Sequence, residues 1–309
     1  MRSLLFVPGD DARKLEKSVS SDADVLIVDL EDSVATSRKD DARSIIRSWW
    51  DAFGSEASDR SRKAGGSVSP ARFCLRINPR GAPAYAADVA LAAELRLAMV
   101  MLPKANSGAD VATLADDLRN HSEAPDTRLP AILPLVTETP RSILSLASYR
   151  DAAQHLAALT WGAEDLAVEL GAQANRGPDG EFSSPFRMVR DLTLIAAADA
   201  GVTAIDTVFT DFRDQEGLAR EAGAAARDGF SGKLAIHPGQ VPIINAAFTP
   251  SDAAIAEAQA VIAAFADAGP DAGVASVDGR MVDEPHRRQA ERLLARAARL
   301  SDAVDDRRA

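Results

Sequence analysis

The chain has 309 residues, of which 46 are acidic and 35 basic, so its formal net charge at neutral pH is −11. This sign disfavours nucleic acids and anionic membranes as partners, and no apolar run approaches the ~20 residues of a membrane span. The chain has one cysteine, Cys74, which excludes an intrachain disulfide and indicates a reducing compartment. Its apolar neighbours predict that it is buried in the core. We therefore expect a cytoplasmic protein.

Eight short apolar runs recur along the chain, separated by segments with helical spacing. They are rich in Val, Ile, Leu and Phe without polar alternation, which is typical of parallel strands covered by helices. The runs begin at Ser3, Val25, Arg72, Ala98, Pro130, Leu156, Thr203 and Lys233. Their number favours an α/β fold of the (β/α)8 TIM-barrel type. Periodicity alone leaves an open doubly wound sheet as the alternative.

The segments between the runs predict helices over residues 38–53 and 185–200. Residues 54–70 are rich in Ser, Gly and charge without periodicity, which predicts a surface loop.

The C-terminal residues depart from the strand and helix rhythm. Ser251 is placed to cap a helix that runs to about Ala268, and Asp278-Gly279 lies between two short apolar pieces, as in a tight hairpin. Pro285 then begins a last helix. We expect a barrel over residues 1–250 and an extension over residues 251–309 that covers the active-site mouth or reaches a neighbouring subunit.

Two carboxylates, Glu138 and Asp165, are predicted to end the fifth and sixth strands, which would place them side by side at the barrel mouth. Such a pair suits Mg²⁺, or alternatively Mn²⁺, and the ion would polarise a substrate oxygen. The structural alternative is that these acids cap helices or pair with Arg141. Glu164 is expected to support the pair. No His or Cys cluster has zinc spacing.

Arg76 ends the third strand, where its guanidinium would bind a substrate carboxylate or a developing enolate. Its alternative role is an ion pair with the acidic cluster after the second strand. Lys104 would hydrogen-bond these acids, which we favour over a role as a Schiff-base amine. The residues expected to support the site in this way are Asp29, Glu31, Asp32 and Lys104.

A basic pocket is expected near the first helix, where Arg13, Lys14 and Lys17 would bind a phosphate-bearing ligand. A solvated basic helix face is the alternative. His237 precedes a proline and is predicted at the start of a loop, facing a ligand or packed within the loop. Dinucleotide, ATP and serine-hydrolase motifs are absent from the sequence.

Several segments in a fixed order resemble the citrate lyase β-subunit and malyl-CoA or citramalyl-CoA lyase family, within the HpcH/HpaI aldolase group. They cover nearly the whole chain and are RSLLFVPGD, DADVLIVDLEDSV, RINP, LPKA, LPLVTETP, LTWGAEDLA, AIDTVFTDFRDQEGL, GFSGKLAIHPGQV and DGRMVDEP. The resemblance implies a Mg²⁺-dependent carbon–carbon lyase that cleaves, or forms, a 3-hydroxyacyl-CoA. Glu138 and Asp165 would bind the metal, and Arg76 the substrate.

The resemblance also implies roles that spacing does not predict. The aspartate of the MVD motif, here Asp283, would enter the active site of a neighbouring subunit for acid/base work, within a trimer or hexamer. Phe6, Lys17, Ile236 and His237 would help to hold the CoA-linked substrate. The sequence differs from the family at Asp11, where an arginine is common, and at the two residues Ala82 and Ala84, where threonine and tryptophan are common.

Three other activities remain open beside the lyase. One is a pyruvate aldolase that needs no CoA, and another is a malyl-CoA thioesterase in which Asp283 activates water. The third is a citrate lyase β-subunit that acts only on a substrate tethered to an acyl carrier protein.

Overall fold

A computed structural model describes residues 1–63, 72–122, 128–269 and 272–308. By its internal contacts the chain divides into two compact units. The first contains Met1–Glu56 and Val68–Phe248, and the second contains Ala57–Ser67 and Thr249–Ala309.

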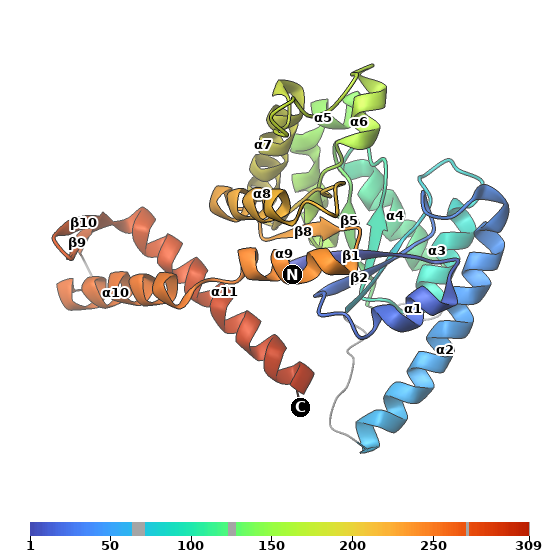
Figure 1. The fold of residues 1–309 in the computed structure, drawn as a ribbon, viewed down its shortest axis with the longest axis horizontal. Helices are drawn as coiled ribbons and strands as arrows, with labels where there is room; N and C mark the ends of the chain where they lie inside the picture. The colour runs from blue at the N-terminus through green and yellow to red at the C-terminus, as the bar shows by residue number, and fades with distance from the viewer. Residues whose placement is uncertain (64–71, 123–127, 270–271, 309) are drawn as a thin grey trace. The chain divides into compact units, whose positions relative to one another are not determined.

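The first unit is a parallel (β/α)8 barrel, as predicted (Figure 1). Hydrogen-bonded neighbours follow the order β5-β4-β3-β2-β1-β8-β7-β6, and parallel bridges join Ile132 to Leu156 and Leu135 to Thr160, which closes β5 onto β6. The strands are β1 Ser3–Pro8, β2 Val25–Asp29, β3 Phe73–Arg76, β4 Met99–Leu102, β5 Ala131–Pro134, β6 Leu159–Thr160, β7 Ala204–Asp206 and β8 Gly232–Ala235.

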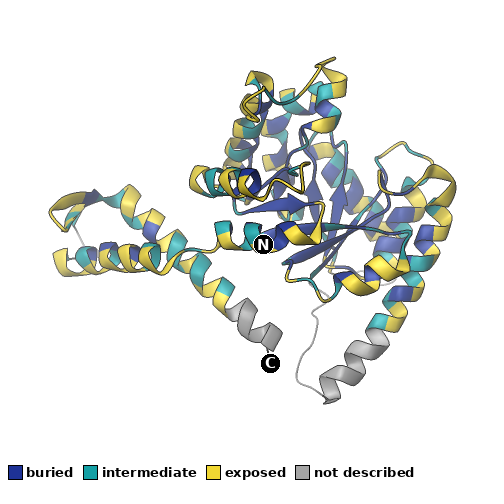
Figure 2. Cartoon of the chain, viewed as in Figure 1, coloured by how far each residue is buried: buried dark blue, intermediate teal, exposed yellow. Residues whose placement is uncertain are grey.

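Side chains alternate between the inside and the outside of the barrel wall, because successive strand residues point to opposite faces. Leu4, Ile27 and Cys74 belong to a buried interior cluster. Their neighbours Leu5 and Val28 join the larger cluster between strands and helices. Both faces of the strands are therefore buried, as Figure 2 shows, which explains why the strand sequences are apolar without alternation.

Helices surround the strands and connect each to the next. The helices before the C-terminal extension are α1 Ala12–Ser18, α2 Lys39–Lys63, α3 Tyr85–Glu94, α4 Gly108–Asn120, α5 Pro140–Leu144, α6 Glu164–Glu169, α7 Ser184–Asp199, α8 Gln215–Asp228 and α9 Val241–Phe248, with shorter 3₁₀ turns η1 Thr36–Arg38, η3 Leu146–His155 and η4 Pro238–Gln240. Among the described residues, no helix is both long and apolar enough to span a membrane.

The second unit contains the predicted hairpin between two helices. Helix α10, Asp252–Ala268, is capped by Ser251 Oγ, which accepts from the Ala254 N–H, and is followed by β9 Val274–Val277, β10 Arg280–Asp283 and α11 Glu284–Arg308. The turn residues Asp278 and Gly279 have φ of 49° and 76°, the left-handed values that a type I′ turn requires. A small apolar cluster that includes Phe265 and Val282 holds these elements together.

Two local predictions were wrong. The helix expected to end at residue 53 continues to Lys63, so the predicted loop is helical at its start, and residues 64–70 lie outside the described part. Glu138 and Asp165 do not end strands: Glu138 follows β5 by four residues, and Asp165 lies in the first turn of α6. The apolar runs are longer than the hydrogen-bonded strands, so the hydrophobic pattern predicted strands that are too long.

Candidate active site

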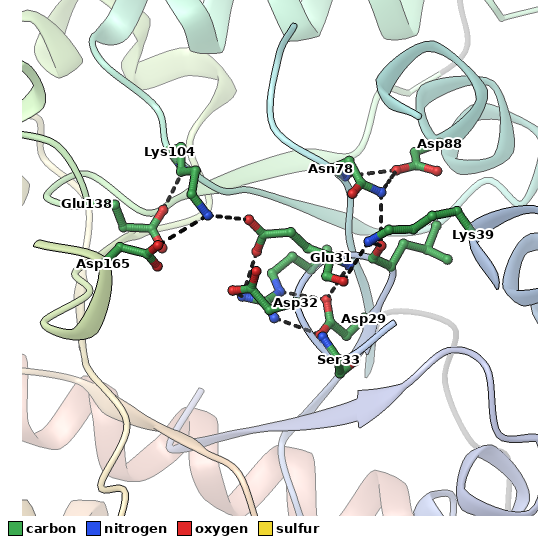
Figure 3. A network of polar contacts seen from close by, with 12 residues as sticks. Asp29, Glu31, Asp32, Ser33, Lys39, Asn78, Asp88, Lys104, Glu138 and Asp165 are labelled. Carbon is green, nitrogen blue, oxygen red and sulfur yellow. Dashed lines mark hydrogen bonds and ion pairs between the residues drawn. The ribbon is translucent and has the colours of Figure 1, made fainter. Parts of the chain in front are cut away.

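Glu138 and Asp165 lie together at the carboxyl end of the barrel, as predicted, and Lys104 contacts both (Figure 3). The Lys104 main-chain N–H donates to Glu138 Oε2 at 2.5 Å, and its Nζ lies 3.4 Å from Asp165 Oδ1. Burial raises the pKa of Glu138 to about 8; the Lys104 N–H opposes this, whereas Glu31 and Asp165 add to it. The charged form of Glu138 is thus disfavoured by burial and by the two neighbouring acids.

Glycine at position 162 allows Glu138 to pack against the loop after β6. A Cβ at Gly162 would lie 3.0 Å from Glu138 Cγ and 3.4 Å from Oε1. The contact with Cγ is tighter than normal packing, so a larger residue would require the Glu138 side chain to shift by a few tenths of an ångström.

Arg76 is held by the acidic cluster on the neighbouring strand. Its Nε and one terminal nitrogen donate to the two Asp29 oxygens at 2.6 and 2.7 Å, and its other terminal nitrogen lies 2.9 Å from Glu31 Oε2. Asp32 is farther, at 3.7 Å, and the Phe6 ring centroid lies 4.7 Å from the guanidinium carbon. The structure therefore brings the predicted arginine and acids together.

The pKa values of the two buried acids move in opposite directions. Burial would raise the pKa of Asp29, but its hydrogen bonds and charge interaction with Arg76 lower it below the ordinary value. Burial raises the pKa of Glu31, and the charges of Arg76 and Lys104 only partly oppose this. Asp29 is therefore the anion that fixes Arg76.

A second group of polar residues, which the sequence analysis missed, contacts the main chain of the acidic loop (Figure 3). Buried Asp88 on α3 accepts from the main chain and side chain of Asn78, at 2.8 and 2.6 Å, and the Asn78 amide also donates to the Leu30 carbonyl. Lys39 Nζ donates to the carbonyls of Leu30 and Glu31. The asparagine two residues after the end of β3 was the available signal, but its hydrogen-bond partners are distant in sequence.

A groove of about 630 Å³ runs beside β1, between α1 and the segment that follows β8. We call it the β1 groove. Among its lining residues are Phe6, Lys14, Lys17, Ile236 and His237. Arg13, predicted with them, is not among the lining residues. Asp11, which departs from the family, caps α1 by accepting from the N–H groups of residues 13 and 14.

His237 lies at the start of the 3₁₀ turn η4, consistent with the break that Pro238 predicts. Its ring stacks on Phe212 with 5.0 Å between centroids, and its Nδ1 accepts from the Gly239 N–H. The Gln240 side-chain oxygen accepts from the main-chain N–H groups of Ile236 and His237. This turn fixes the wall of the β1 groove opposite α1.

Two predicted site residues lie outside these contacts. Glu164 accepts from the Asn175 side chain at 2.8 Å, so it orders the loop after α6. Asp283 lies in the second unit, at the end of β10, where its Oδ1 is 2.5 Å from His286 Nδ1 and its pKa is lowered by that contact. His286 was not predicted, although its spacing of three residues at a helix start was visible in the sequence.

The two carboxylates, Glu138 and Asp165, could hold a hard divalent cation with several coordination positions left for water or substrate oxygens. Within the described ranges, no group of three or more His, Cys, Asp or Glu side chains is arranged as a metal site. A barrel that places two carboxyl groups and a fixed arginine at the carboxyl end of its sheet, with lysines in a groove beside β1, is characteristic of an enzyme for small anionic substrates.

Comparison with known proteins defines the family. The model of the HpcH/HpaI aldolase/citrate lyase family matches residues 2–238, and the chain belongs to this family. It is 35% identical to a citrate lyase subunit beta-like protein of Mycobacterium tuberculosis, over 95% of this chain and 94% of that protein. It is also 35% identical to a (3S)-malyl-CoA thioesterase of Cereibacter sphaeroides, over 96% and 94%.

A solved structure supports the same relationship across nearly all of the chain. The crystal structure of the protein CitE from Mycobacterium tuberculosis, in complex with magnesium, acetoacetate and coenzyme A, matches with a TM-score of 0.77 and 34% identity. The match covers 96% of this chain and 98% of that chain. The family predicted from the sequence motifs is confirmed, and the chain is an enzyme of the lyase type.

Proposed function

We propose that this enzyme is a Mg²⁺-dependent carbon–carbon lyase that cleaves, or forms, a 3-hydroxyacyl-CoA such as citramalyl-CoA, malyl-CoA or citryl-CoA. The observation that carries the proposal is the paired carboxylates Glu138 and Asp165, linked through Lys104 and Glu31 to a fixed Arg76. A retro-Claisen cleavage needs both a chelated hydroxyl oxygen and a donor for the developing enolate.

Glu138 and Asp165 are the proposed metal ligands, with Mn²⁺ as the alternative ion. The fit rests on the buried carboxylate of Glu138 beside Asp165: the pKa of Glu138 is raised by burial and by the neighbouring acids, so that a bound cation would stabilise its charged form. When bound, the cation supplies Lewis-acid polarisation of the substrate hydroxyl or carbonyl oxygen. The relative CitE, crystallised with magnesium, supports this assignment.

Arg76 is proposed to bind the substrate carboxylate or the enolate oxygen. Two of the five N–H groups of its guanidinium donate to Asp29, and one terminal nitrogen is ion-paired with Glu31, so N–H groups remain for a ligand. The acids and the Phe6 ring restrict the orientation of the guanidinium plane. A preoriented donor stabilises developing charge without reorganising in the transition state.

The β1 groove is proposed to bind CoA. Lys14 and Lys17 line it and would attract the phosphates of CoA, while Phe6, Ile236 and His237 provide apolar and aromatic surface. Arg13 would add only long-range attraction. The sequence has Asp11 where the family commonly has an arginine. Lys14 and Lys17 still line the groove, so two positive charges remain there for the phosphates of CoA.

Asp283 is proposed to perform acid/base chemistry in the active site of a neighbouring subunit, within a trimer or hexamer. This proposal rests on the MVD motif and on the exposure of its carboxylate. The barrel over residues 1–250 would then bind the metal and the substrate, and the extension over residues 251–309 would supply Asp283 to the neighbouring subunit. A cytoplasmic location is also proposed, supported by the single buried cysteine.

A second candidate activity is hydrolysis of malyl-CoA. The 35% identity to a (3S)-malyl-CoA thioesterase favours it. The same carboxylates, arginine and groove would bind the substrate, and Asp283 would activate water instead of serving the carbon–carbon cleavage.

The test is a coupled assay of the purified protein with Mg²⁺ on citramalyl-CoA, malyl-CoA and citryl-CoA, with separate detection of the 2-oxo acid and of free CoA. Release of acyl-CoA and an oxo acid identifies the lyase, and release of free CoA with an intact hydroxy acid identifies the thioesterase. Glu138→Ala should abolish either activity, whereas Glu169→Ala, an exposed residue of α6, should retain it. Activity on free pyruvate and aldehyde alone, or only on carrier-bound thioesters, would contradict the proposal.

A further inference from the structure

Lys104 lies between the proposed metal ligands and Glu31 (Figure 3). Its ammonium is 2.7 Å from Glu31 Oε1 and 3.4 Å from Asp165 Oδ1, while its main-chain N–H donates to Glu138. Lys104 thus contacts both proposed metal ligands: its main chain contacts Glu138, and its side chain contacts Asp165.

The backbone of Lys104 has a conformation that lysine rarely adopts. Its φ is 52°, in the left-handed region, two residues after the end of β4. Residues with a Cβ are disfavoured there by steric contact with the backbone, and such conformations persist where surrounding contacts require them. Here the conformation accompanies the 2.5 Å hydrogen bond that restrains Glu138 Oε2.

The ammonium of Lys104 has a different effect on the same pair. A cation held between Glu138 and Asp165 would lie within a few ångströms of this positive charge, in a partly buried site where charges are weakly screened. Glu31 pairs with the ammonium and offsets part of the repulsion. The remaining part opposes cation binding.

We propose that Lys104 is a positioning residue with two opposed effects on divalent-cation binding: its main chain holds Glu138 in a binding geometry, and its ammonium weakens the affinity of the free enzyme for the cation. This inference rests on the proposed function of Glu138 and Asp165. It implies that the cation is held firmly only after substrate oxygens complete its coordination shell.

The test measures Mn²⁺ binding without substrate, by the loss of the free-ion electron paramagnetic resonance signal, for the full-length wild type and three variants. Lys104→Gly keeps the backbone conformation and removes the ammonium, so it should bind Mn²⁺ at least about tenfold more tightly. Lys104→Arg keeps the charge and should stay within about threefold of the wild type. Lys104→Ala should melt at a lower temperature than Lys104→Gly, because alanine is disfavoured at positive φ.

Unchanged or weaker Mn²⁺ binding by Lys104→Gly, with a circular dichroism spectrum like that of the wild type, would overturn the inference while the proposed metal site stands. If Lys104→Gly does not fold, Lys104→Asn replaces it, because asparagine tolerates the left-handed region and is neutral. Glu138→Ala serves as the control for the site itself. Absence of Mn²⁺ binding by both the wild type and Lys104→Gly, or full binding by Glu138→Ala, would overturn the proposed metal site and this inference with it.

Discussion

Arg76 and Asp29 face each other across the paired strands β2 and β3, and both Asp29 oxygens accept from the Arg76 guanidinium. The carboxylate is buried, with 1% of its side chain exposed. A buried charge that loses its partner is strongly destabilising. The pair therefore contributes to folding as well as to the orientation of the arginine.

Asp29→Asn should lower the free energy of unfolding at pH 7 by about 2–4 kcal/mol, because Arg76 would lose its buried anion. The folded-state pKa of Asp29 is lowered, so its contribution is present above the unfolded-state pKa and is lost as the pH falls through the folded-state pKa. Urea unfolding at several pH values should show the difference between wild type and variant shrinking below about pH 4. Asp32→Asn, on an exposed carboxylate 3.7 Å from Arg76, should cost less than about 1 kcal/mol.

Gly162→Ala should reduce activity by roughly 10- to 100-fold, because its Cβ would displace Glu138 from a position that catalysis requires. Steady-state kinetics on the best substrate checks this. Gly223→Ala is the matched control, since a Cβ there meets only the end of a flexible Arg227 side chain and alanine favours helix α8. Equal activity in the two variants would contradict the proposed role of Glu138.

Lys14→Ala and Lys17→Ala should each raise KM for a CoA thioester by about tenfold, with a smaller effect on kcat, because each removes a charged contact in the β1 groove. The effect should weaken as ionic strength rises. Arg13→Ala removes the same charge from the same helix outside the groove lining, and its KM should change little. A similar KM increase in all three variants would indicate a general charge effect instead of a CoA site.

His286→Asn should shift the acid limb of the kcat profile to higher pH. His286 lowers the pKa of Asp283, so its removal returns that pKa toward the ordinary value, and the carboxylate loses its charge at a higher pH. The measurement is kcat from pH 4 to pH 9, beside Arg288→Asn as a control on the same turn of α11. An unchanged profile would remove Asp283 from the acid/base role.

Cys74 should not react with a thiol reagent in the folded protein. It lies in the barrel interior with no exposed surface, and burial raises its thiol pKa far above the ordinary value. Ellman titration should detect one thiol only after denaturation with urea. Rapid reaction in native buffer would show that the barrel opens at β3.

Local patterns in the sequence determined much of this fold. Buried strands need apolar residues on both faces, so eight short runs predicted a helix-covered parallel sheet and the burial of Cys74, and their number favoured the barrel. The hairpin at Asp278-Gly279 followed in the same way from turn residues that tolerate positive φ. These features depend on neighbours in the chain, and a single sequence therefore contains their signals.

The tertiary structure decided those contacts among polar residues that the sequence patterns did not predict. The left-handed backbone of Lys104, its hydrogen bond to Glu138, and the Asp88–Asn78 contact behind the acidic loop join residues that are far apart in sequence or have no local conformational signal. The tertiary structure also decided which basic residues of this segment line the β1 groove. Lys14 and Lys17 line it, and Arg13 does not. Such contacts are set by how the strands close into a barrel, and residue order alone does not specify their geometry.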